Sequence, residues 1–366
     1  MRRRSAEFVL VWLLALAAPW AGAADETARL EARFEPALLE AMKEGPIPGV
    51  AVAVVRGTEV VYAKGFGVKN VERGEPVTAD TLFHCASVTK TFVATAIVQL
   101  EEAGKLELGG TVQQYLPYFT LKDERHKAIT IATLLNHSSG MPDVLNYHWD
   151  RPEFGDDALE NYVRGLSKRK LLSAPGEKHR YSNIGYEILG DLIAKASGET
   201  FEAYVTQHIL RPLGMKTSTL MMPEADPALL TTPHRVRGGA AQVSKTFPYN
   251  REHAPSSTLL SSAHELARWA MLHLNQGELD GVRILKAETA RRMMQPLEPK
   301  FENAGISWFL GEYKGLRTVG HSGGDVGFRC HLMLVPEAAL GIVVLTNGDG
   351  APAPRLAQDA LDALLD

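Results

Sequence analysis

The sequence predicts an α+β fold in which both ends of the chain build one antiparallel sheet and a mostly helical segment is inserted between them. Two β-branched runs, residues 50–55 and 60–63, flank the polar turn Arg56-Gly57 and are typical of a hairpin. Further strand-like runs lie near the C-terminus, whereas Pro and Gly break the middle of the chain into helical pieces. Strands at both ends with helices between them favour a sheet flanked by helices, with an inserted helical lobe.

The expected elements follow one another in a simple order. Apolar side chains recur at helical spacing before Gly45-Pro46, so a first helix should precede the hairpin. A helix should begin at Ser87 and stop before Gly104, where a glycine ends the apolar pattern. The first helix should span 30–43, further helices are expected at 185–196, 263–274 and 355–365, and the expected C-terminal strands are 308–313, 317–321, 329–335 and 341–346.

The first 23 residues have the layout of a secretory signal peptide. Three arginines at positions 2–4 precede an apolar run over residues 8–18, and the Ala-Gly-Ala sequence at 21–23 fits a cleavage site. The run is shorter than the roughly 20 residues that span a bilayer. We therefore expect an exported protein, periplasmic or secreted, with no membrane anchor after the signal is removed.

The charge and cysteine content of the chain limit which partners and which kind of fold are expected. The chain of 366 residues has a net charge of −4 and no basic stripe, which argues against a nucleic-acid partner. Its two cysteines, Cys85 and Cys330, do not make a disulfide scaffold, and the sequence leaves their pairing open. We expect a single domain over 24–366, with a sheet lobe of about 24–86 and 290–366 and a helical lobe of about 105–285.

Ser87 and Lys90 form the strongest candidate for chemistry. A serine hydroxyl is a weak nucleophile unless a base lies beside it. Residues three apart on a helix share one face, with Cβ atoms about 5–6 Å apart, so this spacing places an amine next to a hydroxyl. The helix start also offers free N–H groups for a developing oxyanion. The apolar run 92–100 would bury the stem of Lys90, and burial lowers the pKa of an amine so that it can act as a base.

The spacing alone does not decide, because Ser167 and Lys170 share it within a charge run that is typical of a solvated loop. A helix N-cap with an exposed lysine is the alternative for Ser87. Two further segments support a catalytic role for Ser87. Each of them alone could be an ordinary turn or bulge, but their occurrence together with Ser87 and Lys90 favours an active site. Tyr181-Ser182-Asn183 offers a phenol that relays protons and an amide that binds a substrate carbonyl. His321-Ser322-Gly323-Gly324 ends an expected strand, where glycines allow close approach of a substrate.

In this order the three segments resemble the motifs of the penicillin-recognising serine hydrolases, which include class C β-lactamases, DD-peptidases, D-aminopeptidases and esterases. The stretch 129–142, from Ile129 to Met141-Pro142, is similar to a characteristic segment of that family, and so is the stretch from Pro175-Gly176 to Gly214-Met215. The resemblance covers roughly residues 35–350. It implies a β-lactamase/transpeptidase-like catalytic domain that works without a cofactor or a metal.

The resemblance also implies roles for particular residues. Ser87 corresponds to the acylated nucleophile and Lys90 to its proton acceptor. Tyr181 corresponds to the residue that passes protons to the leaving group and helps to activate the deacylating water. Asn183 would steady Lys90 or bind the substrate amide, and the backbone N–H groups of Ser87 and Gly324 would form the oxyanion hole.

The third motif departs from that of class C β-lactamases, which usually carry Lys-Thr-Gly where this chain has His321-Ser322-Gly323. A histidine there resembles the DD-peptidase, D-aminopeptidase and esterase branches. A neutral imidazole cannot supply the full charge of a lysine, so the expected substrate is a small ester, or a peptide or amide ending in a D-residue. His137 matches a recurrent family histidine, for which we expect a structural role.

Several alternatives remain. Gly320-His321-Ser322-Gly323-Gly324 fits G-x-S-x-G, but that motif needs a helix after the serine and then an acid and a histidine, whereas here a strand is expected and His331 is the last histidine. No H-E-x-x-H or short-spaced histidine pair supports a metal hydrolase. A class C-type β-lactamase and a slowly turning-over penicillin-binding sensor also remain open, as does the oligomeric state. The expected partner is a small-molecule or short-peptide substrate.

Overall fold

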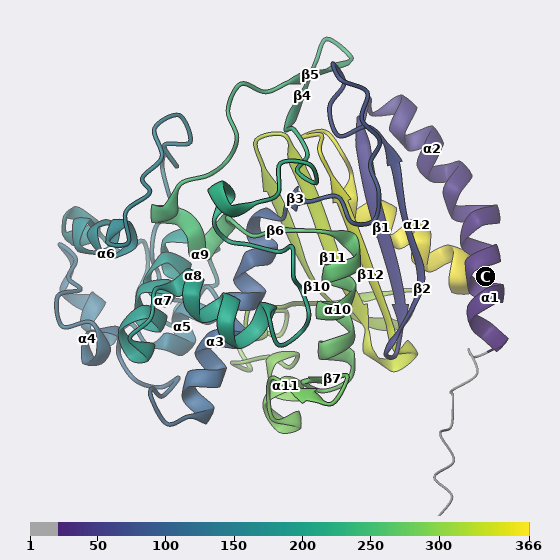
Figure 1. Cartoon of the computed structure of the whole chain (residues 1–366). Helices are drawn as coiled ribbons and strands as arrows, with labels where there is room; N and C mark the ends of the chain where they lie inside the picture. The colour runs from purple at the N-terminus through teal and green to yellow at the C-terminus, as the bar shows by residue number, and fades with distance from the viewer. Residues whose placement is uncertain (1–20, 366) are drawn as a thin grey trace, which may run out of the picture.

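The computed structural model describes residues 21–365, and its centre is a six-stranded antiparallel sheet with the order β2-β1-β12-β11-β10-β9. The two ends of the chain meet in this sheet, because β1 (Gly49–Arg56) pairs with β12 (Leu340–Thr346). Figure 1 shows the sheet beside a helical lobe. The predicted sheet built from both termini is confirmed. Its other strands are β2 (Glu59–Gly67), β9 (Phe309–Tyr313), β10 (Leu316–Asp325) and β11 (Phe328–Val335).

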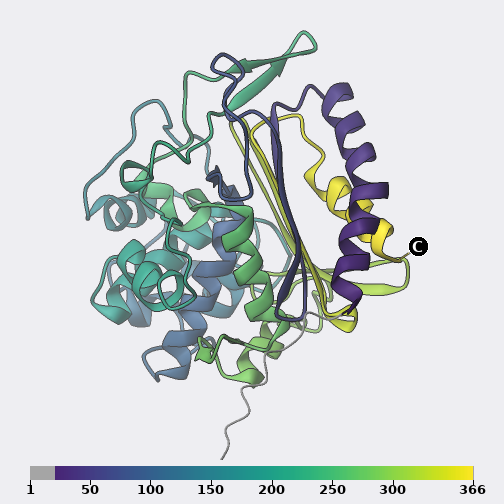
Figure 2. The same cartoon turned by 45° about the vertical axis from the view of Figure 1, so that its right-hand side comes forward.

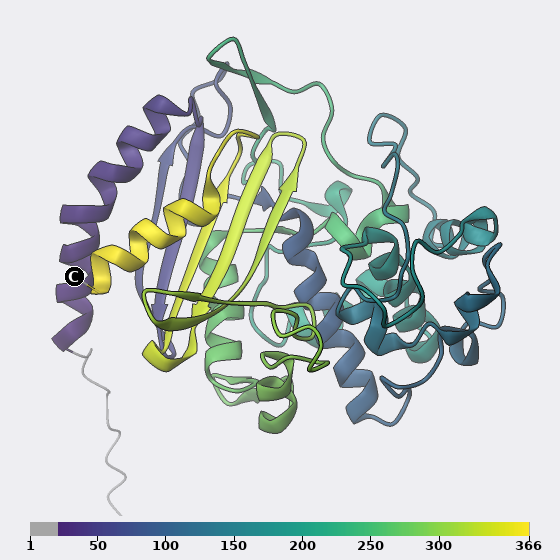
Figure 3. The same ribbon diagram turned by 180° about the vertical axis from the view of Figure 1, so that it is seen from behind.

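Helices cover both faces of the sheet, and β1 shows how the sequence allows this. Alternate side chains of a strand point to opposite faces, and in β1 the valines at 50, 52 and 54 pack with the terminal helices while Ala51 and Ala53 join the core on the other face. Figures 2 and 3 show the terminal helices on one face and α10 on the other. The covering helices are α1 (Ala21–Arg29), α2 (Glu35–Glu44), α12 (Ala353–Leu365) and α10 (Ala263–Leu274), with a π-helical turn, Leu30–Phe34, between α1 and α2.

A helical lobe stands beside the sheet, and one continuous core joins the two. Phe92 stacks on Trp269 at 3.8 Å between ring centroids, and the Trp269 indole N–H donates to Thr91. These contacts bind the long helix of the lobe to α10 and thus to the sheet. The remaining helices are α3 (Thr89–Glu102), α4 (Val112–Tyr115), α5 (Ile131–Leu135), α6 (Ala158–Arg164), α7 (Asn183–Ser197), α8 (Phe201–Val205), α9 (Ala254–Ser257) and α11 (Ala287–Met293).

The structure differs from the expected division of lobes in two respects. Although α10 falls within 105–285, it packs on β1 and β12, because an amphipathic pattern shows that a helix is buried but not against which partner. Strands are also not confined to the ends of the chain. Three short pairs lie between them, namely β3 (Phe83–His84) with β6 (Leu260–Ser261), β4 (His234–Arg237) with β5 (Ala240–Val243), and β7 (Glu278–Leu279) with β8 (Val282–Arg283).

The predicted signal peptide lies mostly outside the described residues. Its last three residues, 21–23, form the start of α1. Between residues 21 and 365, no helix is both long enough and apolar enough to cross a membrane. Export and cleavage after Ala23 stay predictions.

Candidate active site

Ser87 lies on a 3₁₀ turn, Ala86–Val88, that leads from β3 into α3. The helix therefore begins two residues later than the sequence predicts. Ala86 has a φ of 46°, a left-handed conformation that is uncommon for a residue with a side chain. Thr89 holds the turn in place, because its hydroxyl donates to the Ala86 carbonyl at 2.6 Å and accepts from the N–H of Leu259 at 3.1 Å. The turn presents Ser87 to a cavity.

Lys90 is completely buried, and its Nζ lies 2.9 Å from Oγ of Ser87. Burial lowers the pKa of Lys90 to about 7, although the carboxylates of Glu187, Asp325 and Asp143 act in the opposite direction. A large fraction of the amine is therefore free to accept a proton near neutral pH. The structure thus brings together the two residues that the sequence paired.

The amine of Lys90 is held by the backbone carbonyl of Ser256, to which it donates at 2.6 Å. This carbonyl belongs to α9, which packs tightly on α7: a Cβ at Gly190 would lie 2.1 Å from Pro255. The Ser256 hydroxyl donates to the buried Glu187 carboxylate at 2.6 Å. A close helix contact and a buried carboxylate therefore fix the position of the lysine.

Tyr181 lies two residues before α7, and the centre of its ring is 5.2 Å from Nζ of Lys90. Burial raises the pKa of Tyr181, despite its hydrogen bond with Ser87. A phenol that keeps its proton can donate it to a leaving group. Asn183, the first residue of α7, donates from Nδ2 to Asp143 at 2.9 Å. The contact that steadies Lys90 thus comes from Ser256, and the role of Asn183 toward a substrate amide stays a prediction.

His137 lies under Tyr181, with 4.2 Å between the ring centroids. Burial holds the pKa of His137 well below its usual range. The ring is therefore neutral, and its Nδ1 accepts a hydrogen bond from the N–H of Ser182 at 3.2 Å. These contacts support the segment that carries Tyr181, in line with the expected structural role.

The free edge of β10 runs beside the turn that carries Ser87. Strand β9 pairs only with residues 316–320 of β10, so residues 321–325 extend beyond it. A Cβ at Gly323 would lie 2.2 Å from the carbonyl oxygen of Cys85 and 3.1 Å from the backbone nitrogen of Ser87. Only glycine permits this approach, which brings the Gly323-Gly324 edge against the nucleophile. Cys85 and Cys330, whose pairing the sequence left open, are both free thiols here.

His321 is buried, and its Nδ1 lies 2.8 Å from the Ser322 carbonyl. Burial and the neighbouring Lys90 lower the pKa of His321 to about 3, so the ring is neutral at pH 7. A carbonyl only accepts, so Nδ1 carries the proton and Nε2 is a hydrogen-bond acceptor. His321 in this state can accept from a substrate N–H but cannot donate to a carboxylate. The sequence did not reveal this restriction.

Ser87, Tyr181 and His321 line one cavity of about 620 Å³, so the structure brings the three motifs together. Arg329 lines the same cavity, opposite Gly324 in the sheet. One of its terminal nitrogens, Nη1, donates to the carbonyls of Asp325 at 2.8 Å and Phe328 at 2.6 Å. No carboxylate within residues 21–365 forms a salt bridge with Arg329. The cavity thus contains a cation that sequence reasoning missed, because a lone arginine in a strand carries no motif.

A family model described as "Beta-lactamase" matches residues 34–366. The chain belongs to the β-lactamase family. This membership agrees with the fold and with the order of the three motifs, and it makes the chain a β-lactamase-related serine hydrolase by family.

Individual relatives show the breadth of this family. Penicillin-binding protein 4 of Amycolatopsis lactamdurans is 30% identical over 318 residues, which cover 83% of this chain and 82% of the relative. Protein flp of Staphylococcus aureus strain MW2 is 28% identical over 319 residues, which cover 87% of this chain and 63% of the relative. The chain therefore spans less than two thirds of the length of that staphylococcal relative.

Solved structures share the β-lactamase-family fold. The octameric penicillin-binding protein homologue from Pyrococcus abyssi superposes with a TM-score of 0.76 at 29% identity, covering 91% of this chain and 76% of that chain. EstCE1, a hydrolase with promiscuous acyltransferase activity, superposes with a TM-score of 0.76 at 24% identity, covering 93% of this chain and 99% of that chain. At 24% identity, the likeness to EstCE1 indicates a shared fold and nothing about the activity of this chain.

Ser322 also lines the cavity, and its Oγ lies 2.8 Å from Nδ1 of His331. Yet β10 continues to Asp325, and another strand, not a helix, follows. The β-lactamase-family fold therefore excludes the nucleophile elbow of α/β-hydrolases. Among the described residues there is also no group of three or more His, Cys, Asp or Glu side chains placed to hold a metal ion.

Proposed function

We propose that this β-lactamase-family protein hydrolyses an ester or an amide, with small esters and peptides ending in a D-residue favoured, through an acyl intermediate on Ser87. One observation carries the proposal: a fully buried lysine with a pKa of about 7 lies 2.9 Å from the hydroxyl of Ser87. A neutral amine at this distance is a base for the serine at physiological pH.

The remaining residues supply the other parts of the reaction. Oγ of Ser87 attacks the substrate carbonyl as its proton passes to Nζ of Lys90, and the oxyanion is held by the N–H groups of Ser87 and Gly324. The Tyr181 phenol donates its proton to the leaving group and is reprotonated by Lys90. Water then attacks the acyl-enzyme, and the same two residues take up its proton and return one to Ser87.

The presence of Arg329 in the cavity favours peptides that end in a D-residue over small esters as substrates. A D-residue peptide ends in a carboxylate, and a charge-assisted hydrogen bond is about twice as strong as a neutral one. His321 cannot donate to that carboxylate in its neutral form with the proton on Nδ1, whereas the Arg329 guanidinium can. Because the cation is not in the position of the class C lysine, we expect β-lactams to acylate Ser87 but to be turned over poorly.

Purified protein assayed with matched substrates tests this proposal. The panel is p-nitrophenyl acetate, a peptide ending in D-Ala-D-Ala, the same peptide with a C-terminal amide, a D-amino-acid amide and a chromogenic cephalosporin. We expect turnover of the ester and of the free-acid peptide, and none of either by Ser87→Ala. Arg329→Gln should lower kcat/KM for the free-acid peptide about tenfold but leave the capped peptide and the ester unchanged.

Two results would replace the proposal. Cephalosporin turnover far above that of esters and peptides would favour a class C-type β-lactamase. One equivalent of product followed by a stall would indicate a penicillin-binding sensor. Equal effects of Arg329→Gln on capped and free-acid peptides would refute the role given to Arg329.

We also propose that the protein is exported and acts on a small-molecule or short-peptide substrate in the periplasm or outside the cell. The basic and apolar start of the chain supports export. N-terminal sequencing of the protein from its native host should find the chain starting at Ala24. A mature chain that starts at Met1 would contradict this.

A further inference from the structure

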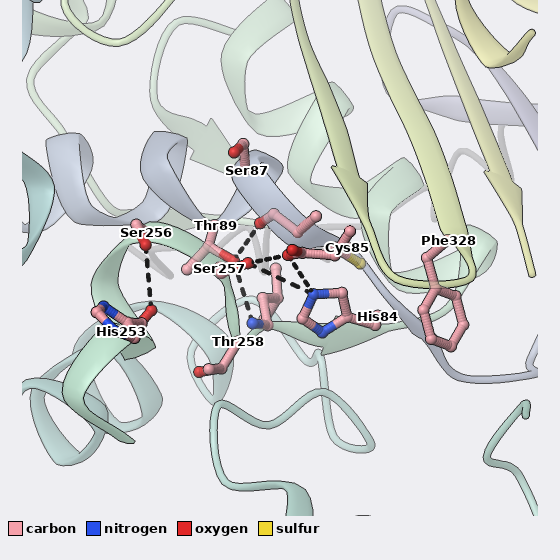
Figure 4. Close-up of polar contacts among 12 residues, drawn as sticks. His84, Cys85, Ser87, Thr89, His253, Ser256, Ser257, Thr258 and Phe328 are labelled. Atoms are coloured by element: carbon pink, nitrogen blue, oxygen red, sulfur yellow. Dashed lines mark hydrogen bonds and ion pairs between the residues drawn. The ribbon is translucent and has the colours of Figure 1, made fainter. Parts of the chain in front are cut away.

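A buried polar cluster next to the nucleophile has no part in the reaction described above. It consists of His84, Ser257 and Asp325 and is called the Asp325 cluster here. Oδ2 of Asp325 accepts a hydrogen bond from the Ser257 hydroxyl and lies 3.0 Å from Nε2 of His84. Figure 4 shows the side chains of Ser257 and His84 pointing toward one another. His84 is 1% exposed and Ser257 is 2% exposed, whereas the Asp325 side chain is 12% exposed, so the donors of these contacts are shielded from water.

Each member of the Asp325 cluster is a close chain neighbour of one part of the active site. Asp325 directly follows Gly324, the proposed oxyanion donor on β10. Ser257 directly follows the residue whose carbonyl holds Lys90. His84 lies in β3, three residues before the nucleophile. One carboxylate oxygen therefore links three segments that are far apart in the sequence, and each of them carries a different part of the site.

The surroundings make this link rigid. The ring of His84 packs against Phe328 at 5.5 Å and Phe247 at 6.1 Å between centroids. The neighbouring backbone is paired as well, since the N–H of Cys85 donates to the Leu259 carbonyl at 2.8 Å. Hydrogen bonds in such a low-dielectric setting are stronger than in water. A shift of about 1 Å in a catalytic group can lower a rate about 100-fold, so fixing these segments matters for the rate.

We propose that Asp325 is a positioning residue for acyl transfer: by accepting from Ser257 and His84, its carboxylate fixes the oxyanion edge of β10 relative to Ser87 and the carbonyl that holds Lys90. This inference rests on the proposed function of Ser87. The same carboxylate also raises the pKa of Lys90, against the effect of burial. Its loss should therefore act on geometry and on the base together.

The test uses Asp325→Asn in the full chain, assayed with p-nitrophenyl acetate between pH 5 and 9. We expect kcat to fall about 100-fold with KM changed less than threefold, because an oxyanion contact acts in the transition state. We also expect the acid limb of kcat/KM to move to lower pH, because the variant lacks a carboxylate that raises the pKa of Lys90. The other titratable groups that face Lys90 are unchanged in the variant; they are Glu187, Asp143, Tyr181, Tyr186, His137 and His321.

Asp191→Asn is the matched control, because Asp191 is a buried carboxyl that, like Asp325, accepts from a hydroxyl, that of Tyr118 at 2.7 Å, but it lies in the helical lobe. This control should keep the wild-type kcat and acid limb. If Asp325→Asn does not fold, Ser257→Ala and Ser257→Thr test the inference instead. The alanine variant should have a lowered kcat, and the threonine variant, which keeps the hydroxyl, should have a kcat close to that of the wild type.

The outcomes separate this inference from the proposal on which it rests. If wild-type protein is not labelled at Ser87 by a fluorophosphonate, the proposed function fails. If wild type is labelled but Asp325→Asn keeps its kcat and acid limb, only the role of Asp325 is overturned. A loss of kcat without movement of the acid limb, or equal rates for Ser257→Ala and Ser257→Thr, also overturns it.

Discussion

Nζ of Lys90 donates to the carbonyl oxygen of Ser256 at 2.6 Å, and this contact aims the amine at the nucleophile. A backbone acceptor holds the lysine whether or not the amine carries an extra proton, because a neutral amine can still donate. The contact thus leaves the nitrogen lone pair free for the hydroxyl of Ser87.

The activity should depend on pH through Lys90. Burial lowers its pKa from the ordinary 10.5 to about 7, so the base is protonated below pH 7 and free above it. We expect kcat/KM for a neutral ester to rise between pH 5 and 8 with a midpoint near 7. Lys90→Arg, whose guanidinium keeps its proton, should lose about 10²–10⁴-fold in rate at every pH. A flat profile in the wild type, or a midpoint near 10, would refute the role of Lys90 as base.

Gly190 should be required for the packing of α9 on α7. Because a Cβ at this position would lie 2.1 Å from Pro255, Gly190→Ala should displace α9 and the carbonyl that holds Lys90. We expect a loss of about 1–3 kcal/mol in the free energy of unfolding, typical of overpacking, together with a lower kcat. Urea unfolding and ester hydrolysis measure the two effects.

Gly185→Ala is the control in the same helix. A Cβ there would meet its nearest neighbour, Leu134, at an ordinary 3.5 Å, and alanine favours a helix over glycine by up to about 1 kcal/mol. Stability should stay the same or rise. Equal losses of stability and kcat in the two variants would show that the close α7–α9 contact is not what the Gly190 substitution disrupts.

Gly323→Ala should disrupt the approach of β10 to the nucleophile. Its Cβ would lie 2.2 Å from the Cys85 carbonyl, which cannot move without shifting the turn of Ser87. We expect at least about a 100-fold loss of kcat/KM. At Gly324 a Cβ would meet only the flexible side chain of Arg329, at 3.2 Å, so Gly324→Ala should have the smaller effect. The reverse order would contradict the assignment of this edge.

His321→Lys should improve the binding of carboxylate-bearing β-lactams more than that of neutral esters. The histidine is neutral because its pKa is lowered to about 3, whereas an ammonium at this position would add a charge. Inhibition constants for a penicillin and KM for p-nitrophenyl acetate give the comparison. Parallel changes in both would show that the charge at position 321 does not select substrates.

The sequence predicted those parts of the fold and site that have a periodic or a motif signal. The hairpin of β1 and β2 consists of two β-branched runs around a polar turn, and α10 lies where its apolar spacing places it. The pairing of Ser87 with Lys90 follows from the geometry of a helical turn. Strands β3 and β6 escaped prediction because two residues show no period.

The missed parts of the site are contacts that tertiary structure creates. The carbonyl of Ser256 could belong to any residue type, so no sequence pattern marks it. Arg329 and Asp325 lie on strands next to the third motif. The role of Arg329 depends on the cavity that it lines, and that of Asp325 depends on its contact with Ser257 of α9, and neither can be read from the sequence. Asn183 was expected to steady Lys90 or to bind the substrate amide; its Nδ2 donates to Asp143, and the Ser256 carbonyl holds Lys90 instead.

The most direct test of the account is the site of covalent labelling by a fluorophosphonate, located by peptide mass spectrometry. We predict one equivalent of adduct on the peptide containing Ser87, absent in Ser87→Ala and unchanged in Ser322→Ala. The second variant is informative because Ser322 lines the same cavity and contacts a histidine. Adduct on Ser322, or labelling that persists in Ser87→Ala, would contradict the account.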